Sequence, residues 1–114
     1  MSEQKKAHIL WTNDNENTSR FMVLFYATNA MTHGLWDNIT VIIWGAPVKL
    51  VAENQAIQEE IKMAQHVGAK FSACLSCARK FGVVEELEAL GIEVIPWVEP
   101  FTELAKSNET IIYV

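Results

Sequence analysis

The sequence lacks the features that mark membrane-spanning, secreted or nucleotide-binding proteins. No apolar run approaches the roughly 18–20 residues that a helix needs to cross a bilayer. The polar start, residues 1–8, has no apolar core of a signal peptide. Gly-x-Gly-x-x-Gly, P-loop and His-Glu-x-x-His motifs are absent, which leaves dinucleotide, nucleoside triphosphate and zinc-protease functions without support. We therefore expect a cytoplasmic protein with no membrane partner.

Basic residues and cysteines are also scarce. The 9 lysines and arginines are outnumbered by 14 aspartates and glutamates, for a formal net charge of −5. Such a balance argues against nucleic acid or an anionic lipid surface as a partner. With only 2 cysteines and no secretion signal, the thiols are expected to be reduced.

The residues that are present predict one α/β domain over residues 1–114. Short apolar runs, read as strands, cover residues 7–12, 39–44, 70–73, 92–96 and 110–114. Helical patterns cover residues 19–32, 55–67, 76–90 and 100–106, with Thr18 as the first N-cap, a short helical turn after Pro47 and a break at Gly82. This alternation predicts a small doubly wound, mostly parallel five-stranded sheet with helices on both faces.

The two cysteines, Cys74 and Cys77, lie on one turn between a predicted buried strand and a predicted helix. The positive end of a helix favours thiolate, and Arg79 and Lys80 add positive charge one turn further on. The alternative is that both cysteines are small buried hydrophobic residues. We favour the functional interpretation, with Cys74 as the reactive thiol and Cys77 as its resolving or supporting partner.

Three chemistries compete for the pair. A thioredoxin-type oxidoreductase is disfavoured because the intervening Leu-Ser is not a Gly-Pro type of turn and the motif follows the third strand. A structural zinc site wants four ligands, and His8, His33 and His66 stand at no ligand spacing from the cysteines, so no metal site is predicted. Sulfur relay needs only one nucleophilic cysteine on an accessible loop, which the sequence supplies.

Large aromatic residues stand where a parallel sheet places its sites, at the carboxyl ends of strands. Three of the tryptophans follow predicted strands, so we expect an indole rim around Cys74, forming a pocket for a small ligand or a partner's tail. The alternative is that they pack loops or fill a subunit contact. The acidic loop 13–17 is a poor phosphate cradle, which argues against a flavin, and no cofactor is predicted. The candidate pocket residues are Trp11, Asn13, Trp44, Arg79 and Trp97.

The predicted first helix is apolar all round, with residues such as Phe21, Met22, Phe25 and Met31 on different faces. One face can cover the sheet, and a neighbouring subunit is the simplest cover for the other. We therefore expect a homo-oligomer; the alternative is a helix central in a monomer.

These segments together resemble the DsrE/DsrF-like family of small sulfur-relay and related proteins. The resemblance is carried by residues 9–17, 20–34, 41–47, 71–74, 77–83 and 90–94. It implies a parallel α/β sandwich that assembles into trimers or hexamers, some of them mixed complexes. It also implies a reactive cysteine on the loop after a strand, which corresponds here to Cys74, with Cys77 second. The expected function is that of a sulfur carrier resembling a sulfurtransferase, with a donor or acceptor protein as partner. The rival interpretation is a non-catalytic oligomeric module that binds a small ligand at a Trp-lined rim.

Overall fold

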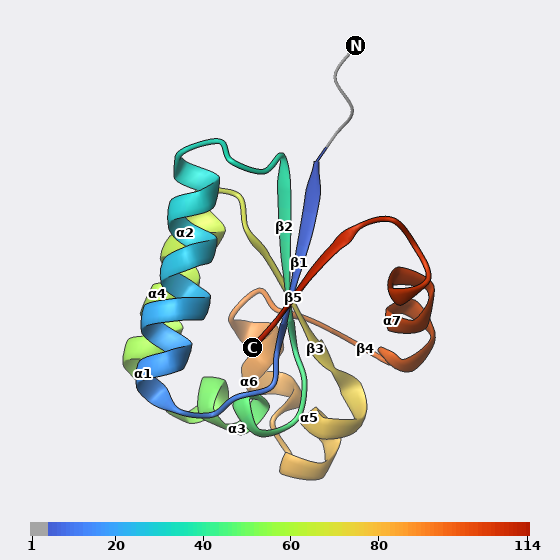
Figure 1. Ribbon diagram of the computed structural model, residues 1–114. Helices are drawn as coiled ribbons and strands as arrows, with labels where there is room; N and C mark the ends of the chain where they lie inside the picture. Colours follow the sequence, from blue (N-terminus) through green and yellow to red (C-terminus); the bar gives the residue numbers. More distant parts are fainter. Residues whose placement is uncertain (1–4) are drawn as a thin grey trace.

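The computed structural model describes residues 5–114, so residues 1–4 of the polar start lie outside the described part. Its centre is a five-stranded sheet with strand order β4-β3-β2-β1-β5, in which all neighbours are parallel (Figure 1). The strands are β1 (Lys6–Trp11), β2 (Asn38–Ile43), β3 (Lys70–Cys74), β4 (Glu93–Ile95) and β5 (Thr110–Tyr113). The five predicted strands are confirmed, and the sheet is wholly parallel where the sequence predicted it mostly so.

The connections are helical. They are α1 (Glu16–Thr18), the π-helical segment η1 (Ser19–Leu24), α2 (Phe25–Thr32), α3 (Ala46–Glu53), α4 (Gln55–His66), α5 (Leu75–Phe81), α6 (Val84–Ala89) and α7 (Val98–Ala105). The predicted break at Gly82 is confirmed, because this residue adopts the left-handed conformation, with φ 68°, that ends α5. Within residues 5–114, no helix is long and apolar enough to cross a membrane.

The first helix starts earlier than its sequence predicted. Asn15 is the N-cap, since its side-chain oxygen accepts a hydrogen bond from the Thr18 backbone N–H at 2.9 Å. Thr18 already has helical backbone angles, so the prediction of Thr18 as N-cap is wrong. Asparagine caps as well as threonine does, and the polar loop contains three asparagines among which the sequence alone does not choose.

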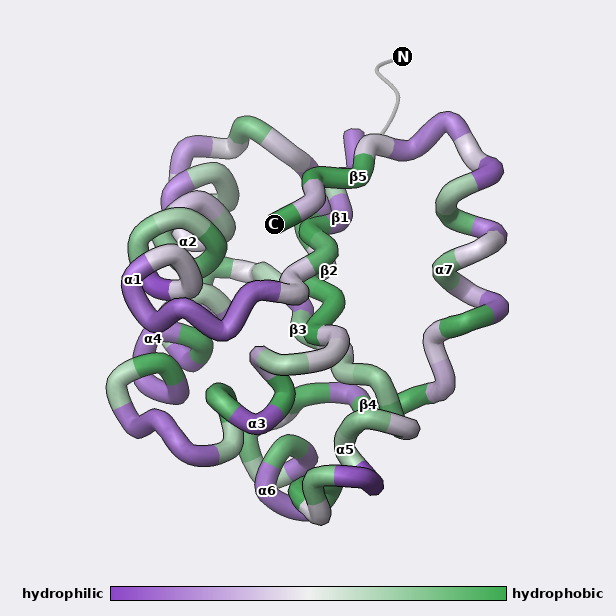
Figure 2. Tube along the Cα trace, turned by 60° about the horizontal axis from the view of Figure 1, so that its bottom comes forward, coloured by the Kyte–Doolittle hydropathy of each residue, from purple (hydrophilic) through white to green (hydrophobic). Residues whose placement is uncertain are grey.

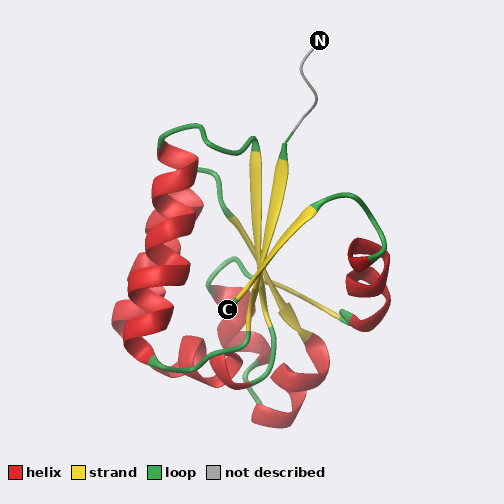
Figure 3. Cartoon of the chain, viewed as in Figure 1, coloured by secondary structure: helices red, strands yellow, loops and turns green. Residues whose placement is uncertain are grey.

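The helices divide unequally between the two faces of the sheet. Figures 1 and 3 show α1, α2 and α4 on one side, α7 alone on the other, and α3, α5 and α6 near the carboxyl ends of the strands. In Figure 2 the largely hydrophobic central strands β1 and β2 lie between α2 and α7. One face of the sheet is therefore thickly covered and the other is covered by a single short helix.

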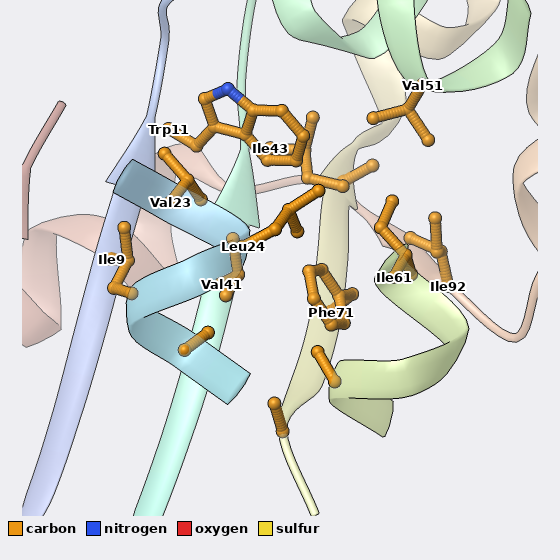
Figure 4. Close-up of a cluster of buried hydrophobic side chains, with 14 of the residues drawn as sticks. Ile9, Trp11, Val23, Leu24, Val41, Ile43, Val51, Ile61, Phe71 and Ile92 are labelled. Carbon is orange, nitrogen blue, oxygen red and sulfur yellow. The ribbon is translucent and has the colours of Figure 1, made fainter. Parts of the chain in front are cut away.

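The main core fills the thickly covered face. Alternate strand residues such as Ile9, Val41 and Phe71 point to that side and meet side chains of η1 and α4, including Val23 and Ile61 (Figure 4). Burying each such side chain stabilises the fold by about 1.5–3 kcal/mol. The opposite face has a smaller cluster, built from Ile42, Trp97 and Leu104 with partly buried neighbours.

Candidate functional site

Cys74 ends strand β3 and is the N-cap residue of α5, with an extended ψ of 119°. Strand alternation gives it the same face as Ser72, opposite to the side on which Phe71 and Ala73 enter the main core. The turn therefore delivers the Cys74 side chain toward the α7 side, at the carboxyl end of the sheet.

The Cys74 side chain lines a hollow of about 330 Å³. Cys74 itself is 4% exposed, so its thiol is reached through this hollow and not from the open surface. Two exposed basic side chains, Arg79 and Lys80, border the same hollow from α5. The remaining lining residues are Leu75, Ser76, Pro96, Trp97 and Val98.

Cys77 lies beside Cys74, one turn into the helix, and is half-buried against the main core. Burial raises the pKa of the Cys77 thiol above its ordinary value of 9.0, and a hydrogen bond and negative charge from Cys74 raise it further. A hydrogen bond from Gly45 and the charge of Lys80 oppose this increase without cancelling it. Burial therefore works against thiolate formation at Cys77, although this thiol lies in the first turn of α5.

The same interactions distinguish the two thiols. Both cysteines are free, with no disulfide between them. The Cys77 thiol can donate a hydrogen bond to the Cys74 sulfur, and this contact with Cys74 is among the causes that raise the pKa of Cys77.

Of the predicted pocket residues, the structure brings Arg79 and Trp97 together with Cys74. Trp97 follows β4 and starts α7, is 8% exposed, and donates from Nε1 to Ser72 Oγ at 2.8 Å. Ser72 in turn donates to Glu93 Oε1 at 2.9 Å. These hydrogen bonds fix the orientation of the indole, which lines both the Cys74 hollow and a larger hollow of about 580 Å³.

Trp11, Asn13 and Trp44 do not reach that hollow, so the predicted rim of three indoles is wrong. Trp11 shares the face of Ile9 and is fully buried in the main core, as Figure 4 shows, with Nε1 donating to the Asn13 carbonyl at 2.8 Å. Asn13 therefore supports the core and the loop. Trp44 packs edge-on against Phe101 of α7, with ring centroids 5.6 Å apart.

The missed distinction was visible in the sequence pattern. Trp11 lies two residues after Ile9, so strand alternation assigns both side chains to the same face of the sheet. The expectation of a rim used only the position of each tryptophan near a strand end, and that position does not say which face the side chain takes. Pro96 and Val98, which border the hollow, carry no chemical signal that sequence reasoning could use. Within residues 5–114, no group of three or more His, Cys, Asp and Glu side chains is arranged to hold a metal ion.

The model of the DsrE/DsrF-like family matches residues 5–112 of the sequence. The chain belongs to the DsrE/DsrF-like family. No curated protein matches it.

Solved structures from other organisms share this fold. A conserved protein of unknown function, BT1422 from Bacteroides thetaiotaomicron, shares 40% identity and a TM-score of 0.94, over 96% of this chain and 95% of that one. MTH1491 from Methanobacterium thermoautotrophicum, also of unknown function, has 15% identity and a TM-score of 0.76, and covers 98% of this chain and 100% of its own. The YchN protein from E. coli has 14% identity and a TM-score of 0.71, and the match covers 98% of this chain and 100% of YchN. At such low identities the last two show the fold alone.

Proposed function

We propose that this chain is a sulfur carrier in which Cys74 accepts a sulfur atom as a persulfide and passes it to a partner protein. The observation that carries the proposal is the position of the Cys74 thiol in a hollow bordered by Arg79 and Lys80, with the Cys77 thiol beside it. Membership of the DsrE/DsrF-like family supports a sulfur-relay-related function of this kind.

The transfer step balances without a further reactant. The Cys74 thiolate attacks the outer sulfur of a donor persulfide, R–S–SH, so that a new S–S bond forms as the donor's S–S bond breaks. The donor's inner sulfur leaves with the electron pair and takes up the proton that Cys74 lost, giving Cys74–S–SH and R–SH. Arg79 and Lys80 would stabilise negative charge on the attacking and leaving sulfur atoms. The Cys77 thiol would donate a hydrogen bond to the Cys74 sulfur.

Mass spectrometry of the intact protein after incubation with a persulfide donor tests this step. The proposal expects an adduct of about 32 Da, one sulfur atom, on the wild type and on Cys77→Ser. The adduct should be lost in Cys74→Ser, and the double variant, which has no thiol, supplies the baseline. An adduct that survives in Cys74→Ser at the wild-type level contradicts the assignment.

The rival function is a non-catalytic module that binds a small ligand and uses its cysteines for packing. The 4% exposure of Cys74 favours it, since a thiol with so little access reacts slowly. Slow alkylation of both cysteines, together with no sulfur adduct on the wild type, is the result that would select this rival.

We also infer that a second copy of the chain covers the outer face of η1 and α2, as part of a trimer or hexamer. Phe21 and Phe25 are 64% and 61% exposed there, and Met63 of α4, next to them, is 60% exposed. Arg20 and Glu60, paired at 2.7 Å, flank this patch with both signs of charge. An apolar patch flanked by charges of both signs suits a contact with another copy of the chain.

A further inference from the structure

A second candidate site lies on the thinly covered face of the sheet, away from the cysteines. Helix α7 packs there over Ile42 and its neighbours, toward the carboxyl half of the strands. The amino-terminal half is left open, and its side chains are polar. The parallel register aligns His8 of β1, Thr40 of β2 and Lys70 of β3 in one row, with Lys6 and Asn38 in the row below.

These five residues and Glu109 line a hollow of about 430 Å³. A second hollow of about 580 Å³ shares Thr40 and Lys70 with it and extends toward α7. The second hollow has apolar walls, among them Ile95 and Trp97. The two together form one elongated trough with a polar end and a largely apolar end, in the size range of small-molecule sites.

The acids of the trough already accept hydrogen bonds, whereas its lysines form no close ion pair within residues 5–114, and the charge of Lys6 acts on Glu109 without a direct contact. Glu109 accepts a hydrogen bond from His8 Nε2 at 2.8 Å, which lowers the pKa of the Glu109 carboxyl, and Glu93 accepts from Ser72 Oγ at 2.9 Å. Among residues 5–114, the ion pairs do not include Lys6 or Lys70. Both ammonium groups therefore have donors free for a ligand.

The polar end is also incompletely hydrogen-bonded without a ligand. His8 adds no donor, because its Nε2 already donates to Glu109 and the Nδ1 of the neutral ring is an acceptor. The amide of Asn38 and the hydroxyl of Thr40 make no side-chain hydrogen bond within residues 5–114. Together with Lys6 and Lys70, they give the hollow donors from three strands that have no acceptor among the described side chains.

The charges define what would fit. Two lysines and one glutamate leave the polar hollow with one net positive charge while His8 is neutral, which suits a monoanion better than a dianionic phosphate. Glu93 in the second hollow disfavours a second negative charge at that end. Strands β1 and β3 lie two strand spacings apart, about 10 Å, so the long side chains of Lys6 and Lys70 can approach one head group from both sides.

We propose that this trough binds a small monocarboxylate with an uncharged apolar tail, its head between Lys6 and Lys70 and its tail against Ile95 and Trp97. The site is separate from sulfur transfer, because it contains neither cysteine and shares only Trp97 with the Cys74 hollow.

Titration with octanoate, followed by amide chemical shifts, tests the proposal on the full chain. Octanoate should shift the backbone amides of residues 6, 8, 38, 40 and 70 and of residues 93–95 and 97. Octanol, with the same tail and no charge, and inorganic phosphate, with charge and no tail, should each bind at least about fivefold more weakly. Binding of octanol or phosphate as tight as that of octanoate would overturn the assigned ligand class.

Charge-removing variants locate the head group. The double variant Lys6→Gln with Lys70→Gln should weaken octanoate binding about fivefold or more. Lys62→Gln, which removes the same charge from an exposed position on α4, is the matched control and should leave binding unchanged. Equal binding by the double variant, or shifts confined to other parts of the chain, would refute the site. Neither result depends on whether Cys74 carries sulfur.

Discussion

Replacing Trp97 with phenylalanine tests whether this indole is the wall that closes the Cys74 hollow. The indole is 8% exposed, and its Nε1 donates to Ser72 Oγ at 2.8 Å. Phenylalanine keeps an aromatic ring but loses this hydrogen bond and leaves space beside Cys74. Ser72 retains its hydrogen bond to Glu93, so no buried hydroxyl is left without a partner.

The expected loss of stability follows from these contacts. A buried hydrogen bond contributes about 0.5–1.5 kcal/mol net, and the void left by the smaller ring adds a further loss of similar size. We expect Trp97→Phe to lower the free energy of unfolding by about 2 kcal/mol. Trp44→Phe is the matched control, because Trp44 is only partly buried and is held by an aromatic contact with Phe101. It should lose less than about 1 kcal/mol.

Two assays read this prediction. Urea denaturation gives the free energy of unfolding of each variant, and native-state alkylation with iodoacetamide gives the reactivity of Cys74. Trp97→Phe should alkylate at Cys74 several times faster than the wild type, whereas Trp44→Phe should match the wild type. Equal alkylation rates in all three proteins would refute the view that Trp97 limits access to Cys74.

Three further predictions concern neighbouring parts of the molecule. Because burial and Cys74 raise the pKa of Cys77, its alkylation should reach half its maximal rate above pH 9.0, and the midpoint should fall in Cys74→Ser; a wild-type midpoint below pH 9.0 would contradict this. Phe25→Glu should reduce the assembled mass measured by light scattering, whereas Leu35→Glu, equally exposed outside the patch, should not; an unchanged mass in Phe25→Glu argues against the interface. Asn15→Ala should cost about 1 kcal/mol in urea denaturation because it removes the first helix cap, and an unaffected midpoint would show that the cap contributes nothing.

Much of the fold could be predicted because the relevant signals are local. The alternation of apolar runs and helical patterns indicated five strands and a parallel sheet, and Gly82 marked the break between α5 and α6. The start of the first helix was displaced because asparagines and a threonine compete for one cap over a few residues. The single helix on one face could not be predicted, since helical spacing does not say on which side of a sheet a helix packs.

The candidate site was predicted less completely than the fold. The location of Cys74 after a strand, with Arg79 nearby, follows from the order of elements and is found in the structure. The indole rim failed because Trp11 and Trp97 lie on opposite faces of the sheet. The raised pKa of Cys77 comes first from burial against the main core, and burial by residues distant in sequence has no local signal.

The central claim is that the thiol of Cys74 accepts the transferred sulfur atom, and peptide mapping tests this claim most directly. Trypsin, which cuts after Lys70 and Arg79, releases residues 71–79 as one peptide that carries both cysteines. After incubation with a persulfide donor and trapping, fragment ions of this peptide should place the added sulfur, about 32 Da, on Cys74. Sulfur found on Cys77 alone, or on neither cysteine, would contradict the account.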